Sequence, residues 1–297
     1  MTARRLRPVS FYLSFFAVTV LVTVLGLLLL SAVLIATALT VPLKFPLCCQ
    51  TPASFGAQYE SINFTTADGL TISGWYVPPK NGAVIILLHS YYADRRQTLP
   101  VAAMLHQAGY GLLMYDQRAS GESEGGSRSL GWRDIPDLRQ AAAWINTHQA
   151  DLKIGAYGCS MGGAIALAGS AGVPSIRAVA ADAPSALQWY ENLPAFSLQD
   201  PLSLPVMALY YPLVILRAQA LPPTSTFQAI QDFGPRPLLF ISTGRDAEFT
   251  RVQAYFEAAR GHRQHWNIPE ADHCSGPASQ PQAYQQHLLD FFNSSLR

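Results

Sequence analysis

The sequence predicts one large α/β domain, built on a mostly parallel sheet with helices on both faces, behind a single N-terminal transmembrane helix. Two observations carry this prediction. Residues 8–43 contain no charged side chain, and residues 44–297 alternate between short β-branched runs and amphipathic stretches. Strand–helix alternation of this kind is typical of crossover units and a parallel sheet. With 49% hydrophobic residues, the 297-residue chain is not expected to be fibrous or disordered.

The charge-free run is long enough to cross a bilayer. At 1.5 Å per residue it exceeds the ~30 Å hydrocarbon core, and it is more than twice the ~7–15 apolar residues of a cleavable signal peptide. We expect a tail and anchor over 1–43, with residues 10–40 in contact with lipid, then a linker over 44–58 and the α/β domain over 59–297. Cleavage in the small-residue stretch 36–38 is the alternative.

Charges at the ends of the run predict its orientation. Arg4, Arg5 and Arg7 precede it, whereas only Lys44 follows closely. The positive-inside rule therefore places the N-terminus in the cytoplasm and the α/β domain on the extracytoplasmic side. The net charge is +1, and no basic stripe follows the sequence, so we expect no nucleic-acid partner.

A hairpin and a series of buried strands are predicted in the α/β domain. The expected strands are 62–65, 70–76, 83–88, 111–115, 153–157, 178–181 and 237–242, and the expected helices are 98–108, 132–147, 161–171, 251–261 and 281–292. The interval 186–233 is too long for an ordinary loop and is rich in aromatic residues. We expect it to form a helical cap over the sheet edge. Its apolar run 205–216 is too short for a second span, which needs ~20 residues.

The candidate nucleophile is Ser160. It lies in a G-x-S-x-G pattern at residues 158–162, between a predicted strand and a predicted helix. A sharp turn there requires glycine on both sides of the serine, lifts its hydroxyl above the sheet, and directs the helix N-terminus at it.

A serine hydroxyl needs a base to become a nucleophile, and His273 is the candidate. It lies in a loop between the last predicted strand and the closing helix, which returns to the sheet edge where Ser160 is expected. An acid must then hold the imidazole in the correct tautomer. Asp246 follows the predicted strand 237–242 and is our candidate, with Glu248 and Asp182 as alternatives.

Two backbone amides are expected to stabilise the oxyanion of a tetrahedral intermediate. One belongs to Met161, which follows the nucleophile, and the other to Tyr91, after the predicted strand 83–88. Neither an H-E-x-x-H pattern nor a Cys/His cluster is present, so we expect no metal ion and no cofactor.

Over residues 59–292 the chain resembles the α/β-hydrolase superfamily. The serine–acid–histidine order matches Ser160, Asp246 and His273, and a cap after the sixth strand is typical of the superfamily. Residues 116–123 resemble its Asp-x-Arg-x-x-Gly-x-Ser segment, whose role there is structural.

A second resemblance lies at His89, which matches the superfamily's His-Gly loop. Here the chain departs from the pattern, because Ser90 stands where glycine is usual. A side chain at this position restricts the backbone of the expected oxyanion loop.

The resemblance implies a serine hydrolase that cleaves an ester or related acyl bond through an acyl-enzyme, and the charge-free run predicts that it is anchored in a membrane. Since superfamily membership does not fix the substrate, a peptidase or thioesterase on the same fold and a catalytically silent binding protein are alternatives. The expected substrate is a small-molecule or lipid acyl compound. Cys48 and Cys49 lie just past the anchor, where they are either idle thiols or sites for interchain bridging or acylation.

Overall fold

The computed structural model describes residues 8–44, 46, 48–191 and 203–296. The arginines of the predicted cytoplasmic tail (Arg4, Arg5 and Arg7) and residues 192–202 of the predicted cap lie outside this part.

Eight strands form one sheet in the described part of the chain, in the order β1-β2-β4-β3-β5-β6-β7-β8. The β1–β2 and β2–β4 pairs are antiparallel, and all other neighbours are parallel. The mostly parallel sheet with an antiparallel start is therefore confirmed. The strands are β1 Glu60–Thr65, β2 Thr71–Val77, β3 Ala83–Leu88, β4 Gly111–Tyr115, β5 Lys153–Cys159, β6 Ile176–Asp182, β7 Leu238–Thr243 and β8 Arg263–Ile268.

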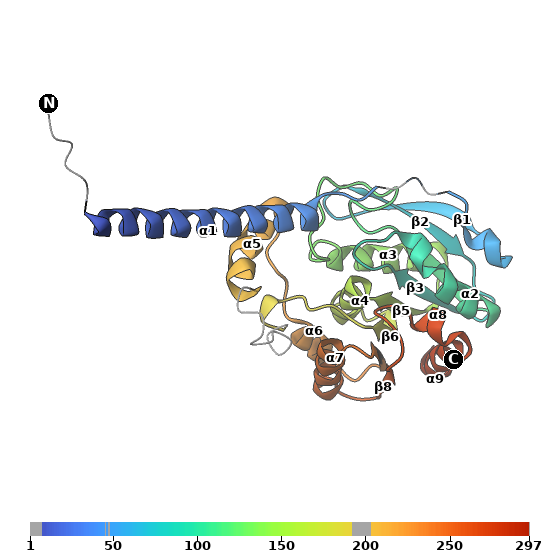
Figure 1. Ribbon diagram of the computed structural model, residues 1–297. Coiled ribbons are helices and arrows are strands. Elements are labelled where there is room, and N and C mark those ends of the chain that lie inside the picture. Colours follow the sequence, from blue (N-terminus) through green and yellow to red (C-terminus); the bar gives the residue numbers. More distant parts are fainter. Residues whose placement is uncertain (1–7, 45, 47, 192–202, 297) are drawn as a thin grey trace, which may run out of the picture.

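Helices cover both faces of the sheet and bury two hydrophobic clusters against it (Figure 1). One face carries α3 (Ile135–His148), α4 (Met161–Ala171), α6 (Thr226–Phe233) and α7 (Asp246–Ala258). The other carries α2 (Leu99–Gln107) and α9 (Pro281–Leu296), with the short α8 (Gly276–Ser279) beside α9. Two short 3₁₀ turns, η1 (Pro52–Phe55) and η2 (Arg95–Thr98), complete the domain.

The start of α7 differs from the sequence prediction. We expected this helix from residue 251, but it begins at Asp246, directly after the short loop that follows β7. The early start changes which acidic side chain faces the sheet edge, as described below.

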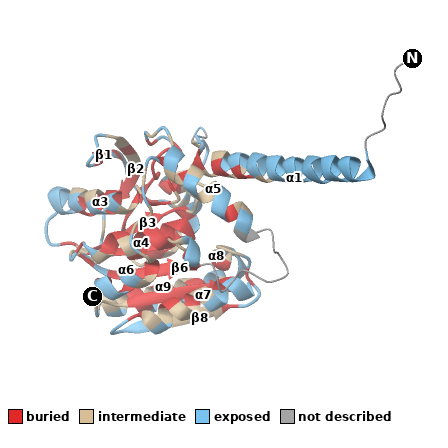
Figure 2. Ribbon diagram, turned by 90° about the vertical axis from the view of Figure 1, so that its left-hand side faces the viewer, coloured by how far each residue is buried: buried red, intermediate tan, exposed pale blue. Residues whose placement is uncertain are grey.

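Helix α1 (Val9–Thr40) projects from the domain for most of its length (Figure 1). Among the described residues it is the helix long and apolar enough to cross a membrane. Residues 9–27 are exposed throughout, and buried positions occur only near the domain, at Ala32, Ala36 and Thr40 (Figure 2). The exposed part is about 28 Å long, close to the ~30 Å thickness of a bilayer hydrocarbon core.

The last turns of α1 are built into the domain. The Arg128 guanidinium donates to the carbonyls of Val41 (2.8 Å) and Ala38 (3.0 Å), and its backbone N–H donates to the Thr40 carbonyl (2.9 Å). Arg217 Nε donates to Thr40 Oγ1 (2.8 Å). Carbonyls at a helix C-terminus lack intrahelical partners and carry partial negative charge, so a cation stabilises them. The end of α1 is therefore part of the folded domain.

Two truncations compare how much the exposed part of α1 and its last turns contribute to stability. Removing residues 1–27 in detergent should leave the melting temperature nearly unchanged, because that stretch makes no buried contact. Removing residues 1–43 should lower it by roughly 10 °C, since losing the Arg128 bonds and the apolar burial costs about 3 kcal/mol. Differential scanning fluorimetry measures both, and equal melting temperatures would contradict the docking of α1.

Candidate active site

Ser160 lies on the sharp turn between β5 and α4. Its φ of 55° and ψ of −119° are unusual for a residue with a side chain. The Ser160 N–H donates to the Asp182 carbonyl (2.8 Å), and its own carbonyl accepts from the Ser185 N–H (3.0 Å). The side chain is 9% exposed. These bonds hold the strained backbone in place at the carboxyl edge of the sheet.

Close backbone contacts explain the two glycines of the motif. A Cβ atom on Gly158 would lie 2.2 Å from the carbonyl of Gly162. A Cβ atom on Gly162 would lie 2.3 Å from the carbonyl oxygen of Leu88. Both distances are shorter than any real Cβ contact, so the turn accommodates only glycine at these positions.

His273 pairs with Glu248. Its Nδ1 lies 2.6 Å from Glu248 Oε2, and the other carboxylate oxygen accepts from the N–H (2.8 Å) and hydroxyl (2.7 Å) of Thr243. Burial acts to raise the pKa of Glu248, but the bonds from His273 and Thr243 outweigh it and hold that pKa below its usual value. An ionised Glu248 fixes the proton on Nδ1, which leaves Nε2 to act as a base.

The prediction that Asp246 orients His273 is wrong, because the structure gives this place to Glu248. Asp246 is exposed in the first turn of α7. The side chains of residues two apart in a helix differ in direction by about 200° around the helix axis. Only one of the two can therefore face the sheet edge. The alternative Asp182 accepts from Tyr284 Oη (2.6 Å), and burial raises its pKa to about 6.

A disulfide brings the candidate nucleophile and the candidate base together. Cys159 and Cys274, with Cα atoms 6.0 Å apart, are bonded to each other and directly flank Ser160 and His273. Within the described residues, Ser160 Oγ bonds to Ser185 Oγ (3.1 Å), and no hydrogen bond joins it to His273. Catalytic hydrogen bonds in unliganded sites are often long and tighten when substrate binds.

Sequence reasoning placed Glu248 behind Asp246, which lies closer to the end of the predicted strand 237–242, and it missed Ser185. Ser185 follows β6, the strand next to β5, so its place at the same edge was a usable signal. For Cys159 and Cys274, the signal was their position beside the two predicted catalytic residues.

The expected oxyanion loop is held from two sides. His89 is fully buried, and its Nδ1 lies 2.7 Å from the Ser90 carbonyl, while Nε2 accepts from the Gln117 N–H (2.9 Å). Burial lowers the pKa of His89, which favours this neutral form. The Ser90 N–H donates to Gln97 Oε1 (2.6 Å), so Tyr91 carries the next amide of the loop. Ser90 has no positive φ in the described chain, and its side chain therefore causes no backbone strain.

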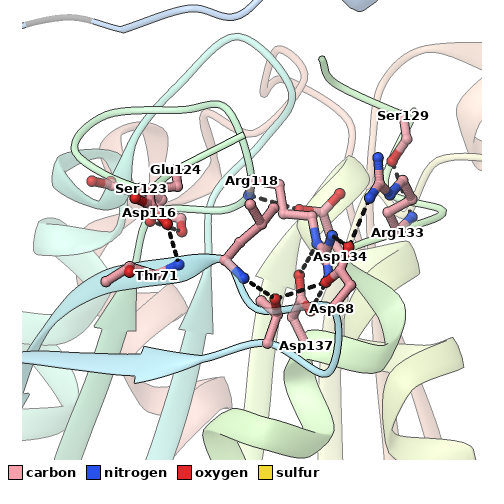
Figure 3. A network of polar contacts seen from close by, with 12 residues as sticks. Asp68, Thr71, Asp116, Arg118, Ser123, Glu124, Ser129, Arg133, Asp134 and Asp137 are labelled. Carbon is pink, nitrogen blue, oxygen red and sulfur yellow. Dashed lines mark hydrogen bonds and ion pairs between the residues drawn. The ribbon is translucent and has the colours of Figure 1, made fainter. Parts of the chain in front are cut away.

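Residues 116–123 form a structural network, as the resemblance implies (Figure 3). The Arg118 guanidinium binds the carboxylates of Asp137 and Asp68, and its backbone N–H donates to Asp134 (2.9 Å). Burial, with Asp137 nearby, raises the pKa of Asp134 to about 7. Gly121 has a φ of 46°, and a Cβ there would overlap the Asp116 carboxylate. The network fixes the long loop between β4 and α3.

That loop carries Arg128, which connects the expected oxyanion loop to α1. Besides the α1 carbonyls, its guanidinium donates to the Tyr91 carbonyl (2.9 Å) and lies 4.2 Å from the centre of the Tyr91 ring. The Tyr91 hydroxyl in turn donates to the Leu39 carbonyl of α1. A cation stacked on an aromatic ring and bonded to its backbone restricts both groups.

A cavity of about 270 Å³ is lined by close neighbours of the candidate nucleophile Ser160. Met161 and Ser185, which neighbour Ser160 in sequence and by hydrogen bond, lie in its wall together with Tyr91. The two residues predicted to supply oxyanion amides thus line one space.

Solved structures with a similar arrangement of strands and helices identify the fold. An esterase from Pyrococcus furiosus is 23% identical, covers 87% of this chain and 99% of its own, and superposes with a TM-score of 0.72. The α/β-hydrolase GrgF from Penicillium is 18% identical, with coverage of 80% and 99% and a TM-score of 0.64. The chain has the α/β-hydrolase fold.

Sequence comparisons match only part of the chain. The model of the X-Pro dipeptidyl-peptidase (S15) family matches residues 71–207. The uncharacterized protein YfhR of Escherichia coli O157:H7 is 30% identical over 41% of this chain and 46% of its own length. The thiohydrolase aneE of Aspergillus aculeatus is 31% identical over 37% and 36%. The matched part thus spans less than half of these curated relatives.

Replacing the two acidic residues one at a time tests the corrected assignment. Glu248→Gln should lower kcat/KM for a p-nitrophenyl ester by roughly 10³- to 10⁴-fold, because His273 loses the carboxylate that fixes its tautomer. Asp246→Asn, the matched control two residues away, should stay within about twofold. The reverse ranking would restore Asp246 as the orienting acid.

The contribution of the disulfide to stability and to the site can be tested, with the other cysteine pair as the control. Replacing Cys159 and Cys274 with alanine should lower the free energy of unfolding by about 2–5 kcal/mol, as for a bond that closes a long loop. Labelling of Ser160 by a fluorophosphonate should also slow. The same double replacement at Cys48 and Cys49, which are exposed free thiols, is the control and should change neither quantity. Equal effects of the two replacements would show that the disulfide does not support the site.

Proposed function

We propose that the chain is a membrane-anchored serine hydrolase that cleaves an ester or related acyl bond through an acyl-enzyme. The observation that carries this proposal is the His273–Glu248 pair, tied by the flanking disulfide to the strained turn that presents Ser160. A surface serine with no catalytic role needs none of these three features. Together they supply a nucleophile, a base and an orienting acid at one edge of the sheet.

In the proposed reaction, Ser160 Oγ attacks the acyl carbon while His273 Nε2 takes its proton. The N–H groups of Met161 and Tyr91 stabilise the resulting oxyanion. When the tetrahedral intermediate collapses, the alcohol leaves with the proton from His273, and the acyl group remains on Ser160. A water molecule then attacks, again giving its proton to His273, and the acid is released with Ser160 restored. These steps require no metal ion or cofactor.

Two features support an extracytoplasmic position for the catalytic domain. The arginines that precede α1 favour a cytoplasmic N-terminus. The Cys159–Cys274 disulfide favours an oxidising compartment, since such bonds rarely persist in the cytosol. The proposed anchor is α1, and its bilayer partner contacts residues 10–40.

A peptidase is the second candidate, because the matched family model is that of X-Pro dipeptidyl-peptidases. The same serine, base and acid cleave amides as well as esters, so the two candidates differ in the substrate and its leaving group. The thiohydrolase relative supports a thioester as a third candidate substrate.

A fluorophosphonate probe tests the serine mechanism in the full-length protein. We expect the wild type to be labelled and Ser160→Ala to be unlabelled and inactive, while Ser185→Ala, the matched control at the neighbouring hydroxyl, keeps the label. Rates on p-nitrophenyl esters should exceed those on X-Pro anilides. A folded wild type that is not labelled would support a silent binding protein, and faster anilide cleavage would support the peptidase.

A further inference from the structure

One residue of α1, Leu39, lies in the wall of the cavity beside Ser160. The rest of the lining comes from the loops that carry Tyr91 and Leu130, from Met161 at the start of α4, from residues 185–189 after β6, and from α5 (Ser203–Ala218). The α5 residues are Met207, Tyr210 and Tyr211. Most of this lining is apolar or aromatic, which suits a hydrocarbon chain.

Helix α5 lies at the end of the domain that faces the bilayer. The exposed span of α1 ends at residue 27, and the first partly buried position follows at Leu28. From there to Thr40, α1 packs against α5, which crosses it where α1 meets the domain (Figure 1). If residues 9–27 fill the hydrocarbon core, α5 lies at the level of the lipid headgroups.

The surface of α5 supports contact with lipid. Leu216 is 73% exposed, Leu209 is 39% exposed, and Leu221, just past the helix, is 78% exposed. The only charged residue of α5 is Arg217, and it bonds inward to Thr40. Large apolar side chains exposed together mark a surface that another apolar phase covers. The neighbouring transmembrane helix identifies that phase as the bilayer.

We propose that this cavity binds the acyl chain of a bilayer lipid ester, which reaches Ser160 past α5 and lies against Leu39. The inference rests on the proposed hydrolase function and narrows its substrate class. It also gives the membrane helix a second role, because α1 then forms part of the acyl site as well as the anchor.

The test uses full-length protein in phosphatidylcholine vesicles with two substrates. 4-Methylumbelliferyl oleate dissolves in the bilayer, and 4-methylumbelliferyl butyrate reaches the site from water. Leu39→Trp fills the cavity, so it should lower oleate turnover by at least about tenfold while butyrate turnover changes by less than about threefold. Leu34→Trp, on the exposed side of the same helix segment, is the matched control and should change neither.

A second variant tests the route from the bilayer. Leu216→Glu puts a charge on the lipid-facing side of α5 without altering the cavity, and should slow turnover of the oleate alone. Leu216→Ile keeps the apolar surface and should retain wild-type rates.

The outcomes separate this inference from the proposed function. If Leu39→Trp changes both esters equally or neither, or if Leu216→Glu leaves oleate turnover intact, the lipid inference is wrong. A wild type that reacts with fluorophosphonate and cleaves butyrate but not oleate also overturns the lipid inference, and the hydrolase proposal survives. A wild type that neither reacts nor cleaves either ester overturns both.

Discussion

The candidate site depends on the turn at Ser160, which connects β5 to α4 and is bonded to the neighbouring strand β6. The positive φ of this residue is held by bonds to Asp182 at the end of β6 and to Ser185 just after it, and by the absence of side-chain atoms at positions 158 and 162. Such strain persists only where the surrounding structure over-determines the conformation. The disulfide from Cys159 to Cys274 extends the same constraint to the loop that carries His273.

A second constraint links this edge to α1. Arg128 lies in the same loop as the buried Arg118–Asp137 pair, and it divides its donors between carbonyls at the C-terminal end of α1 and the Tyr91 carbonyl. The expected oxyanion loop and the C-terminal end of α1 therefore share one cation, and the last turns of α1 pack on the domain. The candidate site and this end of α1 are thus held in a fixed position relative to each other.

The sequence was most informative where a backbone requirement leaves few residue types. The glycines around Ser160, the buried parallel strands and the charge-free helix were predictable because each follows from local geometry or length. The acid that contacts His273 was not, since Asp246 and Glu248 are two residues apart and the choice between them depended on where α7 begins. A start at residue 246 turns Glu248 toward Thr243 and His273 and leaves Asp246 in solvent.

The contacts of α1 with the domain could not be predicted from the sequence, for a different reason. An apolar run long enough to span a bilayer carries no internal sign that its last three turns pack on protein. The small residues Ala32 and Ala36, one turn apart, allow close approach to α5 but are also common in any transmembrane helix. Only the three-dimensional arrangement identifies Leu39 as part of the cavity wall.

The most direct test of the acyl-enzyme account is to locate the covalent intermediate. The full-length protein would be mixed with p-nitrophenyl butyrate, quenched in acid within the first turnover, digested and mapped by mass spectrometry. The account predicts a butyryl group on Ser160. A butyryl group on another residue, or turnover of the ester without any acylated peptide, would contradict it.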